Sequence, residues 1–285
     1  MREKTNMRII QASDITDAVR KMAIEACYYL NSEMTEAFQK AKKNEPSPIG
    51  RIILQELLDN AKLAKKDLVP YCQDTGLAVV FVELGQEVQL EGGLLNDAIN
   101  EGVHQGYDEG YLRKSVCDPL TRKNTGDNTP AIIHVSLVEG DKIKLIFAAK
   151  GGGSENMSSL AMLKPADGVE GIKKFVIQRC VEAGGNPCPP IVVGVGIGGT
   201  FEYAALLSKI ALLNPLAHKN PDPVLARLED EILEELNKSG HGPMGLGGRN
   251  FALGVKILKS PCHIASLPVA VNIDCHAHRH KEMIL

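Results

Sequence analysis

Residues 191–199 read Ile-Val-Val-Gly-Val-Gly-Ile-Gly-Gly, and a second apolar segment follows over 201–213. A short apolar run that begins after Pro190 and ends in glycines is typical of a buried strand, so we predict a strand over 191–197. The spacing of apolar residues over 201–213 predicts a helix. A buried strand that leads into a helix is the repeating unit of α/β proteins, so this stretch predicts a mixed α/β fold.

The same patterns extend outward in both directions from this stretch. Apolar residues at helical spacing predict helices over 15–26, from Pro48 onward, and over 94–107, 167–183 and 223–236. Apolar runs predict strands over 77–84, 131–138, 142–149, 251–258 and 264–273. The turn residues 139–141 predict that the strands over 131–138 and 142–149 pair as a hairpin. No linker or repeat divides the chain, so we expect one mixed α/β domain over 1–285, with an N-terminal helical region and a hairpin-containing sheet.

Composition excludes several classes of protein. The 285 residues are 44% hydrophobic and 24% charged, which excludes a disordered or fibrous chain. The net charge of -3 does not indicate a nucleic-acid surface, and no apolar run is long enough to span a bilayer. Arg2 and Lys4 are not followed by the apolar segment of a secretory signal. We therefore expect a cytoplasmic protein that binds neither nucleic acid nor membrane.

The seven cysteines fall into groups that differ in their surroundings. An odd number without a secretory signal argues against a disulfide framework. Cys72, Cys188 and Cys275 lie in predicted loops or at the ends of predicted strands, where a thiolate can face a cleft. Cys27 and Cys180 lie on apolar helix faces and are expected to be buried thiols. No Cys-x-x-Cys pair is present, so spacing alone leaves open a shared metal site or scattered structural cysteines.

Glycine-rich segments offer two further candidate sites. Gly194, Gly196 and Gly199 match the dinucleotide-binding pattern G-x-G-x-x-G, but no suitable acid follows about twenty residues later. The alternative explanations, which we favour, are close packing of the strand on the helix or an anion held at the start of the helix. The segment 150–156, Lys-Gly-Gly-Gly-Ser-Glu-Asn, offers backbone N–H groups for a carboxylate or phosphate but lacks the ending of a Walker loop. The alternating histidines at 276, 278 and 280 fit either zinc ligands or an exposed tail.

Several blocks in order along the chain resemble one enzyme family. They include Cys72-Gln73-Asp74-Thr75-Gly76, Asn124 to Pro130, Lys150 to Glu155, Gly185 to Pro190, and Cys262 to Asn272 followed by Cys275. This sequence resembles the class I, iron–sulfur-dependent fumarate hydratase and L-tartrate dehydratase family. Within that family the chain is similar to the α subunit of a two-chain enzyme, or to the N-terminal half of a fused one.

The resemblance implies a [4Fe–4S] cluster with one open iron, held by Cys72, Cys188 and Cys275. An iron without a protein ligand acts as a Lewis acid toward the hydroxyl group of a hydroxy diacid. The implied reaction is the reversible hydration of fumarate to L-malate. Dehydration of tartrate or another hydroxy diacid is the alternative.

The resemblance also implies roles for five other residues and for a second chain. Asp74 is the expected acid for the leaving hydroxyl and His263 its partner. Gln73, Arg113 and the Gly152 backbone are the expected substrate-binding groups. The base is not found in this chain, so a β subunit is expected to supply it. A nucleotide-binding α/β protein and a non-catalytic iron–sulfur sensor remain as functions of other classes.

Overall fold

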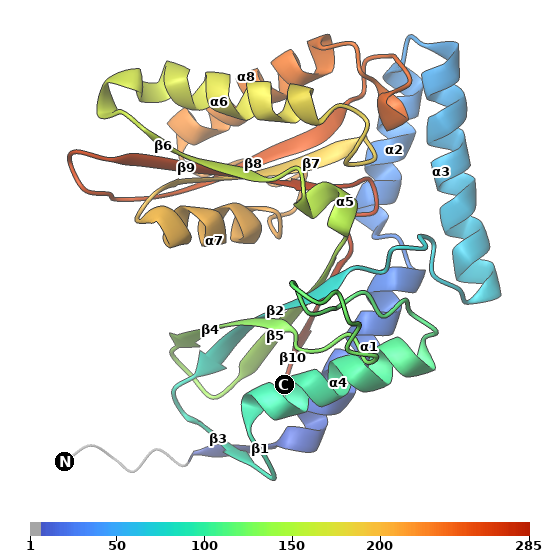
Figure 1. Ribbon diagram of the computed structural model, residues 1–285, viewed down its shortest axis with the longest axis vertical. Coiled ribbons are helices and arrows are strands. Elements are labelled where there is room, and N and C mark those ends of the chain that lie inside the picture. The colour runs from blue at the N-terminus through green and yellow to red at the C-terminus, as the bar shows by residue number, and fades with distance from the viewer. Residues whose placement is uncertain (1–6) are drawn as a thin grey trace. The chain divides into compact units, whose positions relative to one another are not determined.

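The computed structural model describes residues 7–285 (Figure 1), so Arg2 and Lys4 lie outside the described part of the chain. The described residues form two compact units. The first unit contains residues 7–30, 60–151 and 279–285, and the second contains residues 31–59 and 152–278. Both units combine helices with a sheet, which confirms the mixed α/β class. Among residues 7–285, no helix is long and apolar enough to cross a membrane.

The first unit is built around a four-stranded sheet in the order β10-β5-β2-β4. Its strands are β2 (Leu77–Gly85), β4 (Ile132–Val138), β5 (Ile143–Lys150) and β10 (His280–Ile284). Its helices are α1 (Ala12–Tyr28) and α4 (Leu95–Glu109), and β1 (Arg8–Gln11) pairs in parallel with β3 (Val88–Glu91). The helices α1 and α4 pack closely, and the Thr16 hydroxyl of α1 donates to the Ala98 carbonyl of α4 at 3.0 Å. The core of this unit therefore lies between that helix pair and the sheet.

The predicted hairpin is wrong. The strands β4 and β5 are not neighbours, because β2 lies between them, parallel to β4 and antiparallel to β5. The short 139–142 connection instead crosses the end of β2, where the Gly85 amide donates to the Lys142 carbonyl at 2.9 Å. A Cβ on Gly85 would lie 2.3 Å from the Gly140 carbonyl oxygen, so glycine is needed for this crossing. The residues of β2 are apolar on both faces, as suits a central strand.

The second unit has its own four-stranded sheet, in the order β6-β9-β7-β8. Its strands are β6 (Ser159–Leu163), β7 (Ile191–Gly198), β8 (Ala252–Ser260) and β9 (Leu267–Asp274). Its helices are α2 (Ser32–Asn44), part of α3 (Pro48–Asp67), α5 (Gly152–Glu155), α6 (Gly168–Ala183), α7 (Phe201–Ala211) and α8 (Pro223–Lys238), with short 3₁₀ turns at Pro165–Asp167 and Pro243–Gly245. Helices α6 and α8 cover one face of the sheet and α7 covers the other (Figure 1). The central strand β7 is consequently almost wholly buried.

The glycines of the 194–199 pattern serve packing. Gly194 and Gly196 lie inside β7 rather than in a loop after it. A Cβ on Gly194 would lie 2.1 Å from the Ser208 carbonyl oxygen of α7, and a Cβ on Gly196 would lie 2.1 Å from that of Ala204. The backbone of α7 thus rests directly on the backbone of β7. This contact accounts for the two glycines without a nucleotide.

A buried carboxylate joins two distant segments of the second unit. Glu45, 2% exposed, accepts hydrogen bonds from the backbone amides of Ser47 (3.0 Å), Arg249 (2.9 Å) and Asn250 (2.9 Å), and from the Asn250 side chain (2.6 Å). Burial opposes ionisation of Glu45, but these hydrogen bonds outweigh burial and hold its pKa below its usual value.

We therefore expect Glu45 to stabilise the fold in a pH-dependent manner. Because the folded-state pKa is lowered, the stabilisation is present above the unfolded pKa of about 4.3 and is lost as the pH falls through the folded value. Glu45→Gln should lower the free energy of unfolding by about 1–3 kcal/mol at pH 7, because a donor replaces an acceptor. Urea titrations of both proteins from pH 7 to pH 3 should show the difference shrinking. A difference that is constant with pH would contradict this account.

Candidate functional site

Three predicted site residues lie in one loop of the first unit. Cys72, Gln73 and Asp74 occupy the connection between α3 and β2. The side chain of Gln73 is exposed, whereas Cys72 and Asp74 are half-buried. The Asp74 carboxylate accepts the Gly76 amide at 3.0 Å, the short turn that an Asp residue commonly makes. The surface of this loop therefore carries Cys72, Gln73 and Asp74 side by side along the chain.

The buried end of this loop is tied to the core of the unit. The Tyr107 hydroxyl, from α4, donates to the Thr75 carbonyl at 2.8 Å and lies 3.1 Å from the Gly76 carbonyl oxygen. The Asn128 side-chain amide donates to the Gly76 carbonyl at 3.2 Å. Tyr107, Thr75 and Asn128 are each at most 1% exposed, so water does not compete for these bonds. The loop that carries Cys72 and Asp74 is thus fixed on its buried side.

Arg113 is placed beside this loop. Its side chain is exposed, in the segment that follows α4, and its carbonyl accepts the Thr75 hydroxyl at 3.1 Å. The structure therefore brings the Arg113 segment to the loop of Cys72, Gln73 and Asp74. An exposed guanidinium in this position can hold both oxygens of a carboxylate.

Cys188 and Cys275 come together in the second unit. Cys188 precedes β7, Cys275 follows β9, and these two strands are antiparallel neighbours. The His276 amide donates to the Cys188 carbonyl at 3.2 Å, and His276 Nδ1 lies 3.1 Å from the same oxygen. Both cysteines are half-buried. The sequence separation of 87 residues between them is therefore closed by a direct backbone contact.

Gly152 lies next to the Cys188 segment. It begins α5, and a Cβ on the following Gly153 would lie 3.3 Å from the Asn186 carbonyl oxygen. Helix α5 is anchored by Glu155, which pairs with Lys209 at 2.5 Å and accepts the Asn272 amide at 3.1 Å. This anchoring holds the exposed backbone of Gly152 at the same end of the sheet as Cys188.

His263 lies elsewhere in the second unit. Its exposed loop joins β8 to β9, and the neighbouring Pro261 carbonyl accepts the Gly199 amide at 3.2 Å, at the far end of β7 from Cys188. Figure 1 shows this connection and α5 at opposite ends of the sheet. A strand rises about 3.3 Å per residue, so β9 separates His263 from Cys275 by roughly 20 Å or more. The structure does not bring His263 to the two cysteines of its own chain.

The C-terminal histidines neither form an exposed tail nor gather around a zinc ion. His278 is 2% exposed, and its Nδ1 lies 2.8 Å from an Asp274 carboxylate oxygen. Over residues 7–285, no group of three or more His, Cys, Asp or Glu side chains is arranged to hold a single metal ion.

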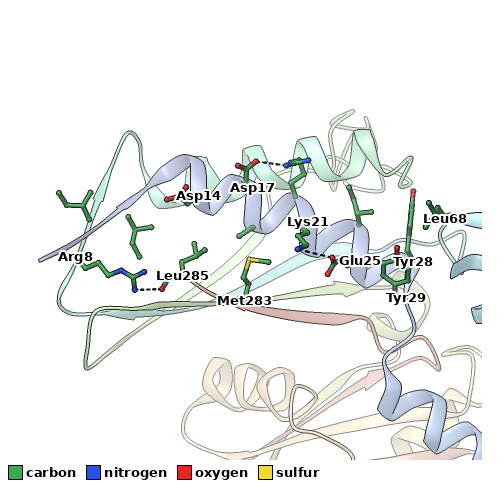
Figure 2. Close-up of a pocket in the computed structure, with 15 residues that line it drawn as sticks. Arg8, Asp14, Asp17, Lys21, Glu25, Tyr28, Tyr29, Leu68, Met283 and Leu285 are labelled. Atoms are coloured by element: carbon green, nitrogen blue, oxygen red, sulfur yellow. Dashed lines mark hydrogen bonds and ion pairs between the residues drawn. The ribbon is translucent and has the colours of Figure 1, made fainter. Parts of the chain in front are cut away.

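A groove in the first unit lies apart from the predicted site residues. It has a volume of about 820 Å³ and runs along α1, lined by residues that include Asp17, Lys21, Glu25 and Tyr28 (Figure 2). The charged groups that line it largely pair with one another, as Arg20 does with Asp17 at 3.0 Å. Its lining includes none of the eight predicted site residues.

The sequence did not single out Tyr107 or Asn128. Asn128 lies within one of the motifs that carry the family resemblance, and Tyr107 ends a predicted helix. A buried tyrosine or asparagine usually has a hydrogen-bond partner, but the sequence does not say which carbonyl it reaches.

The structure separates the thiols by burial. Cys27 is 1% exposed and Cys180 is fully buried. Burial raises the pKa of Cys27 to about 11 and that of Cys180 to about 12. These two thiols are poor metal ligands, because the ligand form is the thiolate. The predicted division between buried and loop cysteines is consistent with this result.

Thiol labelling should follow the same division. In the folded chain at pH 8, iodoacetamide should leave Cys27 and Cys180 unmodified, because a protonated, buried thiol is a poor nucleophile. The exposed Cys262 provides the internal control for reagent quality. Peptide mass spectrometry identifies each modified cysteine. Modification of Cys180 at a rate similar to that of Cys262 would contradict the burial described here.

Named relatives indicate the class of the protein. The chain is 44% identical over 272 residues to the "Putative L(+)-tartrate dehydratase subunit alpha" of Methanocaldococcus jannaschii, covering 93% of this chain and 95% of the relative. It is 32% identical over 274 residues to the L(+)-tartrate dehydratase subunit alpha of Escherichia coli O157:H7, covering 95% and 90% respectively. Dehydratases of this kind are hydro-lyases, so the chain is a hydro-lyase α subunit.

A family profile makes the assignment more specific. The family described as fumarate hydratase (fumerase) matches residues 16–284, nearly the whole described chain. The chain therefore belongs to the fumarate hydratase (fumerase) family. This result confirms the resemblance that the cysteine-containing and glycine-rich motifs indicated.

Proposed function

We propose that the protein is the cluster-bearing α subunit of a hydro-lyase that reversibly hydrates fumarate to L-malate. The observation that most supports a shared site is the contact between the Cys188 and Cys275 segments, because it joins two of the three expected ligands. The dehydration of L-tartrate is the second candidate. It is favoured by the names of the relatives at 44% and 32% identity.

The proposed cofactor is a [4Fe–4S] cluster held by Cys72, Cys188 and Cys275. The donor set fits, because all three thiols are half-buried in loops or at strand ends, whereas Cys27 and Cys180 are buried and protonated. When bound, such a cluster supplies an iron that acts as a Lewis acid toward a hydroxyl group. The proposed compartment is the cytoplasm, whose reducing conditions keep thiols available as ligands.

The chain's own residues then bind the substrate and move one proton. Arg113 holds a carboxylate through its two-nitrogen fork, while Gln73 and the Gly152 amide offer further hydrogen bonds. Asp74 gives its proton to the leaving hydroxyl as general acid during dehydration and removes it during hydration. A β subunit is proposed to supply the base for the C3 proton, because the named relatives are α subunits.

The test compares cluster binding with turnover. Anaerobic reconstitution of the α chain with iron and sulfide should give the visible absorbance of a cluster but no turnover of L-malate. Addition of the β chain should produce fumarate, followed by its ultraviolet absorbance. Cys72→Ser should lose the absorbance and the activity, whereas Cys180→Ser should keep both. Full turnover by the α chain alone would contradict the proposed division, and faster turnover of L-tartrate would favour the second candidate.

The position of His263 leads to a proposal about the assembly. A shared cluster would place Asp74, two residues from Cys72, near Cys275 at one end of β9. His263 lies beyond the other end of that strand. On this proposal, His263 of one chain would not reach Asp74 of the same chain. We infer that His263 pairs with Asp74 of a second α chain.

Mixed variants test this exchange. Asp74→Asn and His263→Asn should each be inactive when prepared alone with the β chain. Co-expression of both variants should restore about one quarter of wild-type activity, because in a two-fold dimer half the dimers are mixed and half their sites are intact. Separate affinity tags show that mixed dimers have formed. Mixed dimers without recovered activity would refute the exchange.

A further inference from the structure

Arg279 is a buried cation for which the proposed mechanism gives no role. It is 4% exposed and immediately precedes β10. Its carbonyl accepts the Ala149 amide of β5 at 3.0 Å, so its backbone is fixed to the sheet of the first unit. Burying a guanidinium is costly unless the surroundings supply acceptors or opposite charge. The contacts of the Arg279 side chain therefore indicate its role.

The guanidinium of Arg279 lies against the loop that carries Cys72 and Asp74. Its Nη1 donates to the main-chain oxygen of Asp74. Its Nη2 and the Asp74 carboxylate both adjoin Gly151, since a Cβ there would be 3.2 Å from Nη2 and 3.3 Å from Asp74 Oδ2. The absence of a side chain at Gly151 thus leaves room for both groups.

The charge of Arg279 acts on the same neighbourhood. Burial raises the pKa values of Cys27 and Tyr107, and Arg279 opposes that rise while Asp74 adds to it. Arg279 and Asp74 are therefore both close to the two buried groups beneath the loop. Tyr107 and Asn128 fix the loop at Thr75 and Gly76, and Arg279 fixes it at Asp74 itself.

We propose that Arg279 is a positioning residue for this site. It holds the main chain at Asp74 and so sets the direction in which the Asp74 carboxyl and the nearby Cys72 thiol point. Arginine suits this role better than lysine, because its planar fork can donate one nitrogen to the carbonyl and still offer a second donor to a neighbouring acceptor. The catalytic consequence rests on the proposed function, whereas the effect on the loop does not.

Hydrogen exchange of the cluster-free α chain tests the effect on the loop. Arg279→Met should increase deuterium uptake in a peptide covering residues 71–78 and leave residues 214–220 unchanged. The matched control is Lys256→Met, which removes another buried cation. Lys256, 6% exposed, donates to the carbonyls of Leu216 (3.0 Å) and His218 (2.5 Å). Lys256→Met should increase deuterium uptake over residues 214–220 and leave residues 71–78 unchanged.

A second variant, Arg279→Lys, tests the same effect on the loop if Arg279→Met does not fold. Circular dichroism and thermal melting establish that each variant is folded. Arg279→Lys keeps the charge and should give an uptake over 71–78 between those of the wild type and Arg279→Met, or above the wild type if only the lysine variant folds. Wild-type uptake over 71–78 in every folded Arg279 variant would overturn the proposal.

Steady-state kinetics with the β chain test the catalytic consequence. Per bound cluster, Arg279→Met should lower kcat about 100-fold, the usual effect of displacing a catalytic group by about 1 Å. KM should change little, because Arg113, Gln73 and Gly152 remain. Arg279→Lys should recover part of kcat, and Lys256→Met should match the wild type. An unchanged kcat in Arg279→Met would overturn the positioning role. Increased uptake over 71–78 in Arg279→Met, together with a wild type that hydrates no diacid, would instead reject the proposed function alone.

Discussion

The bond from the Tyr107 hydroxyl to the Thr75 carbonyl is the contact on which the first unit's part of the site depends. It connects the helix pair α1 and α4 to the loop that carries the first expected ligand and the proposed acid. Buried carbonyls at a sharp turn need donors, and strand pairing cannot supply them there. Tyr107 supplies a donor from the core at the cost of desolvating its own hydroxyl. This bond fixes the loop through a main-chain carbonyl and uses no side chain of Cys72, Gln73 or Asp74.

Local sequence patterns predict much of the fold. The wrong prediction concerns which strands pair, because pairing depends on segments that are distant in the sequence. The strand over 191–197 and the helices over 15–26 and 94–107 are each visible in the spacing of apolar residues. The pairing of β4 with β2 instead of β5 is not visible in that spacing, because two strands joined by a short connection look like a hairpin in any sequence. Gly85 is needed where the connection crosses β2, but its role depends on a contact with Gly140, 55 residues away.

The sequence predicts those parts of the candidate site whose chemistry depends on the type of a single residue. Cys72, Cys188 and Cys275 stand out because each lies in a predicted loop or at the end of a predicted strand. The surroundings of Arg279 were not predictable, since burial of an arginine is rare and its partner, a main-chain oxygen, has no signature. The place of His263 follows from strand direction, which the sequence does not state. Motifs therefore predict candidate groups, and strand topology decides which of these groups lie together within one unit.

The first unit is assembled from three separate stretches of the chain, and the last of them is residues 279–285. This stretch supplies both the edge strand β10 and the guanidinium that rests on Asp74. During synthesis on the ribosome, the 72–76 loop is complete long before its final clamp emerges. A nascent or prematurely terminated chain would thus expose β5 as an open sheet edge and present an unclamped Asp74 loop. A product that lacks residues 279–285 would therefore be open to proteolysis at β5 and at the Asp74 loop.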